Sequence, residues 1–129
     1  MAAAENRTEK YARVSDLEEL LQDLNSNLTG ANENYLKNSS ERFFKIFLMG
    51  AHRSGSTLFM QWLANTGLAA YPTNLLSRFF GAPLVGAKIQ QLLTDSRYNF
   101  RNEILDFNSN INFRSDNGKT KGALAPNEF

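Results

Sequence analysis

The sequence predicts an α/β fold: a three-layer α/β/α arrangement around a parallel sheet, preceded by an amphipathic helix. Two observations predict it. The nearly continuous apolar run "RFFKIFLMG" is typical of a parallel strand buried on both faces. It is followed by a glycine-containing loop, a helix, a short strand and another helix, which is the order of a βαβ series. We divide the chain into a helix with a polar linker, 1–40, and an α/β domain, 41–129.

The first element is a helix predicted over residues 14–28, because apolar residues recur there at spacings of three and four. Ser15 and Glu18 have the spacing of a capping box, and Gly30 suits the end of a helix. The polar residues 31–41 then form the linker. The apolar stripe either packs on its own domain or joins two chains in a homo-oligomer. It consists of Val14, Leu17, Leu21, Leu24 and Leu28.

The next helix is expected inside "SGSTLFMQWLANTG", ending at Gly67. "LAAYP" reads as a short strand ended by Pro72, and "TNLLSRFFGAPLVGAKIQQLLTDS" as two helical pieces interrupted at "GAP". Pro83 suits the first turn of the second piece, and "SDNG" is a turn signal. The apolar face of the helix before Gly67 is expected to carry Leu58, Phe59, Trp62, Leu63 and Thr66.

Composition excludes several functions. The net charge of +1 gives no reason to expect nucleic-acid binding. The absence of cysteine excludes disulfides and cysteine-built zinc sites, and one histidine, His52, cannot build a histidine-rich metal site. The N-terminus has no apolar core, and the apolar runs are too short to cross a bilayer. We therefore expect a cytoplasmic protein that binds neither membrane nor metal.

The loop after the predicted strand has the outline of a phosphate-binding loop. Gly50 and Gly55 have the Walker spacing, and Thr57 occupies the final hydroxyl position, but Ser56 stands where the Walker lysine belongs. The helix N-terminus behind the loop still favours an anion, and the fixed cation has moved to Arg53. Such a P-loop-like segment is poorly equipped for triphosphate hydrolysis, yet it can hold one tetrahedral anionic group.

The stretch "GAHRSGSTL" resembles the phosphosulfate-binding loop of the sulfotransferases that use 3′-phosphoadenosine 5′-phosphosulfate (PAPS). The resemblance implies transfer of a sulfonate group, without a metal, to a hydroxyl or amine of an acceptor. The acceptor is a small molecule or a glycan that the sequence does not identify. Arg53 would be the catalytic residue, acting on the oxygens around the sulfonate. The cofactor-binding residues implied are His52, Arg53, Ser54, Gly55, Ser56 and Thr57.

The chain also departs from that family. His52 replaces the usual proline, and we interpret it as a loop residue rather than a catalytic base. The arginine-and-serine element for the 3′-phosphate is missing, and family members are longer. The resemblance covers residues 43–72, with looser similarity in "AYPTNLLSRFFGAP" and "GKTKGALAPNEF". We therefore expect a truncated, inactive form with an incomplete sheet, prone to self-association through exposed apolar strands.

Other assignments stay open. Glu103, Asp106 and Glu128 are candidate general bases by residue type only, and surface carboxylates are the plainer interpretation. Lys119 and Lys121 form a basic loop that is either a solvated turn or a contact to an anionic substrate or cofactor. The alternative functions are a deviant P-loop kinase or triphosphatase, for which "EILDF" is a weak Walker B imitation, and a non-enzymatic oligomerising fragment.

Overall fold

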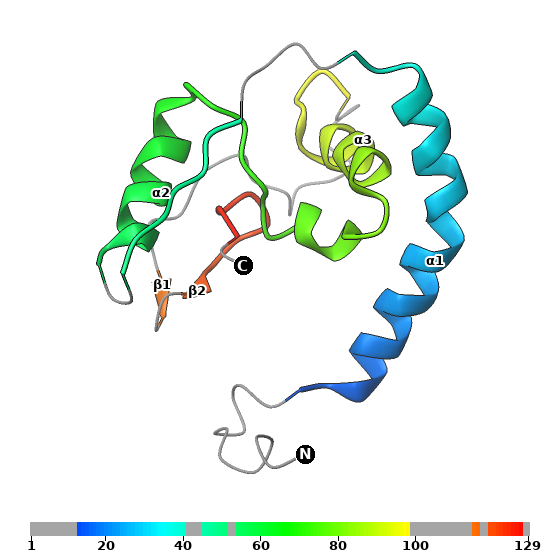
Figure 1. Ribbon diagram of the computed structural model, residues 1–129, viewed down its shortest axis with the longest axis horizontal. Helices are drawn as coiled ribbons and strands as arrows, with labels where there is room; N and C mark the ends of the chain where they lie inside the picture. The colour runs from blue at the N-terminus through cyan, green and yellow to red at the C-terminus, as the bar shows by residue number, and fades with distance from the viewer. Residues whose placement is uncertain (1–12, 41–44, 52–53, 99–114, 117–118, 128–129) are drawn as a thin grey trace.

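A computed structural model describes residues 13–40, 45–51, 54–98, 115–116 and 119–127. The fold is largely helical in this part of the chain (Figure 1). α1 runs along one side, and α3 and the short 3-10 helix η2 pack against it. The elements are α1 (Ser15–Lys37), α2 (Ser56–Thr66), η2 (Leu76–Phe79), α3 (Pro83–Thr94), β1 (Ser115–Asp116) and β2 (Lys119–Thr120).

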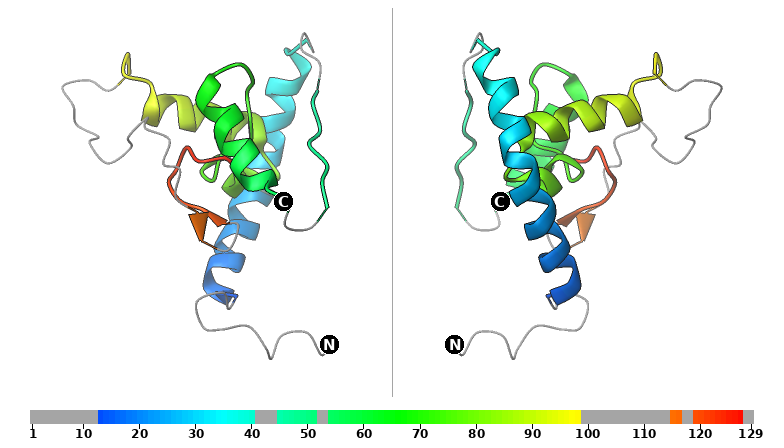
Figure 2. Two further views of the ribbon diagram at one scale, coloured as in Figure 1. Left: turned by 90° about the vertical axis from the view of Figure 1, so that its left-hand side faces the viewer. Right: turned by 90° about the vertical axis from the view of Figure 1, so that its right-hand side faces the viewer.

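The parallel sheet expected from the sequence is wrong for the described residues. Their only strands, β1 and β2, form one antiparallel pair of two residues each. The described part of the apolar run, 45–50, has no regular secondary structure, and Phe47 and Met49 are 81% and 88% exposed. Figure 2 shows segment 45–51 along the outside of the molecule. A buried strand needs partners at its edges and cover on both faces. The second expected strand, 68–72, does not form, so it provides neither an edge partner nor cover for the run at 45–50.

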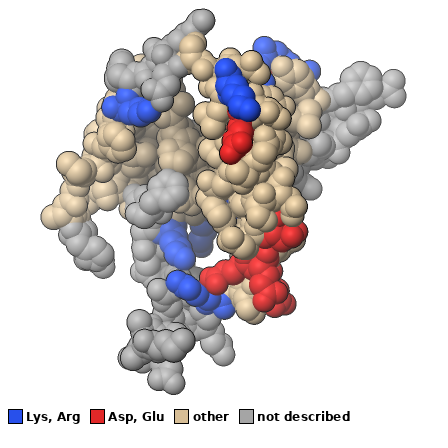
Figure 3. All heavy atoms as spheres, turned by 45° about the vertical axis from the view of Figure 1, so that its right-hand side comes forward, with Lys and Arg blue, Asp and Glu red and all other residues tan. Residues whose placement is uncertain are grey.

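α1 is longer than predicted. It continues through Gly30 to Lys37, so the expected end and the linker after it are wrong. The capping box is wrong as well, because the N-cap is Val14 and the Ser15 hydroxyl donates to the Asp16 carboxylate at 3.2 Å. The N-terminal half of the helix extends beyond the rest of the molecule (Figure 2). Four of its five acidic side chains lie on that half (Figure 3).

Two buried asparagines, Asn25 and Asn32, join α1 to the rest of the chain. Asn25 Nδ2 donates to the carbonyl of Arg78 at 2.9 Å, and Asn25 Oδ1 accepts from the amide of Gly81 at 2.8 Å. Asn32 Oδ1 accepts from the amide of Leu84 at 2.8 Å, in the first turn of α3. Asn32 therefore caps α3 from another helix, and both contacts explain why α1 extends so far.

The bounds of α2 agree with the prediction, and Gly67 ends it in the left-handed conformation with φ 68°. The predicted apolar face is wrong: Leu58, Phe59 and Trp62 are exposed, whereas Gln61 and Ala64 are buried. Gln61 Nε2 has no hydrogen-bond partner among the described residues. The apolar face of α2 is thus left uncovered by the part of the chain that the structure describes.

The two helical pieces around "GAP" are confirmed as η2 and α3, with Pro83 at the start of α3. They turn back on each other because Gly86 lets Phe79 approach closely. A Cβ atom at Gly86 would lie 2.6 Å from Phe79 Cβ. Phe79 is accordingly among the few buried apolar side chains of this small core.

The C-terminal described segment, 119–127, lies against residues 71–78. Thr73 and Pro126 form an antiparallel bridge, and the Tyr71 hydroxyl donates to the carbonyl of Leu124 at 3.0 Å. β1 and β2 pair with Ser115 opposite Thr120, so the first two residues of the predicted "SDNG" turn lie in a strand. None of the helices described is both long enough and apolar enough to cross a membrane.

Candidate functional site

The loop between residues 50 and 57, called the anion loop below, makes a tight turn in its described part. The amide of Ser54 donates to the carbonyl of Ala51 at 3.2 Å. Gly50 lies close to the Ser54 hydroxyl, since a Cβ atom on Gly50 would stand 2.6 Å from Ser54 Oγ. Any other residue at position 50 would force the serine side chain to rotate. The first glycine of the motif, Gly50, therefore allows its backbone and the Ser54 side chain to approach closely across the loop.

The second glycine, Gly55, connects the turn to α2. Its φ of 84° is in the left-handed region, and the amide of Phe59 donates to its carbonyl at 3.1 Å, so Gly55 is the N-cap of the helix. No acidic side chain lies in the first turn. Ser56 and Thr57 occupy that turn and are half-buried. The helix start thus carries the positive end of the dipole and hydroxyl groups, a combination suited to an anion.

The predicted site residues divide into two groups. The structure brings Ser54, Gly55, Ser56 and Thr57 together at the start of α2. The other predicted site residues and candidate bases lie outside the described residues. They are His52, Arg53, Glu103, Asp106 and Glu128.

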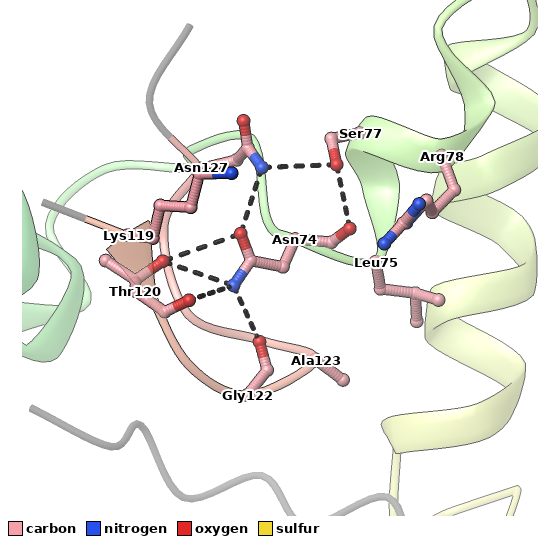
Figure 4. Close-up of a pocket in the computed structure, with 9 residues that line it drawn as sticks. All are labelled: Asn74, Leu75, Ser77, Arg78, Lys119, Thr120, Gly122, Ala123 and Asn127. Atoms are coloured by element: carbon pink, nitrogen blue, oxygen red, sulfur yellow. Dashed lines mark hydrogen bonds between the residues drawn. The ribbon is translucent and has the colours of Figure 1, made fainter. Parts of the chain in front are cut away.

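A second region was not predicted from the sequence. A cavity of about 680 Å³, called the polar cavity below, lies between residues 74–78 and the C-terminal segment 119–127 (Figure 4). Among the described residues, its lining includes the basic residues Arg78 and Lys119. The two walls come from "AYPTNLLSRFFGAP" and "GKTKGALAPNEF", which sequence reasoning treated as separate segments. The signal available was the basic loop at Lys119 and Lys121, and only Lys119 lines the cavity.

Asn74 is the centre of the cavity wall. Its Nδ2 donates to the carbonyl of Thr120 at 3.1 Å and to the carbonyl of Gly122 at 3.0 Å. Its Oδ1 accepts from Asn127 Nδ2 at 2.9 Å. Asn127 Nδ2 also donates to the Ser77 hydroxyl at 3.2 Å. These bonds, drawn in Figure 4, fix the C-terminal segment against the turn before η2.

Arg78 stands apart from this network. Its backbone carbonyl is held by Asn25, but its guanidinium makes no hydrogen bond or ion pair within the described part of the chain. The side chain is exposed at the rim of the cavity (Figure 4). An arginine in this position can offer several N–H donors to a bound group. Among the described residues, no three His, Asp or Glu side chains gather as metal ligands would.

Comparison of the chain with protein-family models, curated proteins and solved structures gives no match. The resemblance to the sulfotransferases therefore rests on the residues quoted for it, and the described fold does not supply the parallel sheet which that resemblance implies.

Proposed function

We propose that the anion loop binds the phosphosulfate group of PAPS and that the protein is sulfotransferase-like. One observation carries the proposal: a left-handed Gly55 sets a tight, hydroxyl-rich turn directly before the first turn of α2. Amides at a helix start stabilise an anion by about 0.3–1 kcal/mol per charge at exposed sites. The cytoplasmic location expected from the sequence, where the donor would be met, is part of this proposal.

The residues present fit the sulfonated end of the donor. Ser54 and Gly55 are exposed, so an anion can reach the backbone of the turn. In the transfer, the bond between sulfur and the phosphate oxygen breaks, and that oxygen keeps the electron pair. A bond forms between sulfur and the acceptor oxygen or nitrogen, whose proton passes to a base. Arg53 would neutralise the charge on the leaving phosphate oxygen.

The sequence favours this reading over a kinase or triphosphatase. Ser56 occupies the position of the Walker lysine, and a serine cannot supply the charge which that lysine places on the β- and γ-phosphates. A non-enzymatic, oligomerising fragment is the remaining alternative. It predicts that no nucleotide binds at the loop.

Calorimetric titration of the chain with adenosine 3′,5′-bisphosphate, in the presence of a chelator, tests the proposal. We expect binding without metal. ATP that binds more tightly, and only with Mg²⁺, would favour the kinase. The absence of binding by either nucleotide would favour the non-enzymatic fragment.

The variant Arg53→Gln locates the binding. We expect it to weaken bisphosphate binding at least tenfold, because one charge-assisted contact to phosphate is lost. The melting temperature should not change, since the sequence predicts a loop at this residue. Arg13→Gln is the matched control, because Arg13 is an exposed arginine outside the loop. Its Nε atom lies 3.6 Å from Glu18 Oε1. Equal weakening in both variants would contradict the assignment.

A further inference from the structure

We propose that the N-terminal half of α1 is a docking surface for another protein, and that the partner is a basic amphipathic helix. This surface, called the α1 docking surface below, is separate from the anion loop and does not depend on the proposed function. It combines exposed leucines with acidic side chains on one helical segment. Its residues are Val14, Leu17, Leu20 and Leu24, with Asp16 and Asp23 along the edge.

The apolar side chains of the α1 docking surface are left uncovered. Leu20 is 62% exposed, and Val14 and Leu17 are exposed as well. Leu17 precedes Leu20 by three residues and Leu24 follows it by four, so the three leucines share one face of the helix. In the described part of the chain, the hydrogen bonds that join α1 to distant residues begin only at Asn25. The helix before it extends past the rest of the molecule (Figure 2).

The charge of this surface favours a basic partner. Residues 14–36 include five acidic residues and no basic one, and four of the five lie on the N-terminal half of α1 (Figure 3). Asp16 precedes Leu20 by four residues and Asp23 follows it by three, so both carboxylates border this leucine on the helix surface. Lysine or arginine side chains beside the apolar stripe of a partner helix would face these carboxylates, as charged residues beside a coiled-coil seam do.

The charges of Asp16 and Asp23 are not neutralised by another side chain in the described part of the chain. The Asp16 carboxylate accepts from the Ser15 hydroxyl at 3.2 Å, and the Asp23 carboxylate accepts from Asn27 Nδ2 at 3.1 Å. Both donors are neutral, so each carboxylate keeps its charge and has lone pairs left for a cation. Exposed ion pairs contribute little each, so the leucines would supply most of the affinity and the charges would select the partner.

Charge also separates a basic helix from other occupants of this surface. A second copy docked stripe to stripe would bring the same acidic edges together, which like-charge repulsion disfavours. An anionic membrane surface would be repelled as well, because helices that lie on such membranes carry lysine and arginine on their polar face. Residues 1–12 contain two acidic and two basic side chains, so they bring no net positive charge. A basic helix of another protein is therefore the occupant that the charges favour.

The probe is a fluorescently labelled helical peptide with leucine at its seam positions and lysine beside them. The whole chain is titrated into it, and binding is followed by fluorescence anisotropy. The matched probe is the same peptide with glutamate in place of lysine. We expect the lysine peptide to bind at least tenfold more tightly than the glutamate peptide. Its binding should weaken severalfold in about 1 M NaCl, where the Debye length is about 3 Å.

Leu20→Ser tests the apolar part of the surface. We expect it to weaken binding of the lysine peptide about tenfold, because the side chain would be buried only in the complex. The melting temperature should not change, since Leu20 is exposed in the chain alone. Leu36→Ser is the matched control, because Leu36 is an exposed leucine of α1, 53% exposed, outside the docking surface. This variant should bind normally.

Asp16→Asn with Asp23→Asn tests the acidic edge and should weaken binding of the lysine peptide severalfold. Glu19→Gln with Glu33→Gln is the matched control, because it removes two charges from the same helix, outside the leucine face. We expect a smaller loss of binding in the control, since net charge changes equally in both variants and only the edge differs.

The proposal is overturned if the lysine peptide does not bind, or if the glutamate peptide binds as tightly. It is also overturned if Leu36→Ser weakens binding as much as Leu20→Ser, or if the two charge variants weaken it equally. Light scattering of the chain alone examines the competing occupant. A dimer that Leu20→Ser dissociates would show that a second copy covers this surface, and the proposal of a basic partner would end.

Discussion

Asn25 is the residue on which the packing of α1 most depends. It is 2% exposed and makes hydrogen bonds to Leu21, Arg78 and Gly81. Asn25→Ala leaves the carbonyl of Arg78 and the amide of Gly81 without this partner. A buried polar group left without its partner costs about 1–3 kcal/mol, so we expect the free energy of unfolding to fall by about that amount. Urea denaturation followed by circular dichroism measures the change.

Asn27→Ala is the matched control, because the same side chain is removed two positions away on the exposed face of α1. Asn27 donates only to Asp23, within its own helix. We expect a change within about 0.5 kcal/mol. Equal losses for the two variants would show that the contacts of Asn25 with distant residues are not what stabilises the fold.

The sequence could not have identified Asn25. Its partners Arg78 and Gly81 lie 53 and 56 residues away, and periodicity compares only near neighbours. The apolar stripe on α1 predicts which face of the helix is packed against the protein. A polar residue beside such a stripe, as Asn25 is, is normally solvated. Val14, at the start of that stripe, is 58% exposed. The end of α2 and the start of α3 were easier to predict. Gly67 and Pro83 act through the geometry of their own backbone, so the residue type alone indicates the effect.

The carboxylate of Asp95, after the end of α3, predicts a measurable pH effect. Arg97 Nη2 lies 2.6 Å from Asp95 Oδ2, and Arg97 Nε and its backbone amide also donate to Asp95. The side-chain bond, followed by the backbone bond, lowers the pKa of Asp95 from 3.8 to about 2. Because the folded pKa is lowered, this contact stabilises the fold above the ordinary pKa. The contribution is lost as the pH falls towards 2.

Arg97→Gln tests that pKa. We expect the pKa of Asp95, measured by carbon-detected NMR titration, to rise towards its ordinary value. The rise should be incomplete, because the backbone amide of residue 97 still donates to the carboxylate at 2.9 Å. A pKa that stays near 2 in this variant would show that the guanidinium is not the main cause.

At the scale of elements, the joint between η2 and α3 depends on a glycine in a helix. Alanine is favoured over glycine there by about 1 kcal/mol in helix propensity. At position 86, however, a Cβ atom would lie 2.6–2.8 Å from three atoms of Phe79. Overpacking of a core typically costs about 1–3 kcal/mol. We therefore expect Gly86→Ala to lower the melting temperature measured by calorimetry.

Gly30 provides the control, because it lies inside α1 and nothing would stand within 4 Å of its Cβ. Gly30→Ala should raise stability by about 0.5–1 kcal/mol, from propensity alone. Opposite signs for the two substitutions identify close packing at Gly86. If both variants were more stable than the wild type, Phe79 would have moved aside and the packing argument would be wrong.

At the scale of the whole molecule, the sequence predicted some local elements and not their assembly. α2 ends at Gly67 and α3 begins at Pro83, as local signals predict, and η2 lies within the predicted first helical piece. The parallel sheet failed because it depends on long-range pairing, and no second strand pairs with the run at 45–50 among the described residues. The anion loop could be recognised because its spacing is local. The polar cavity could not, since its walls are about 46–53 residues apart in the chain.

Exposed apolar side chains predict self-association. Besides the uncovered face of α2, one group is Phe47 and Met49, and another is the start of the stripe on α1. Exposed apolar clusters on a soluble chain favour contacts between molecules. We expect Phe47→Ser with Met49→Ser to reduce concentration-dependent association in light scattering, without a loss of melting temperature, because neither side chain is buried. Val14→Ser with Leu17→Ser is the comparison. If only that pair reduces association, the chains join through the stripe on α1, and the exposed run at 45–50 plays no part.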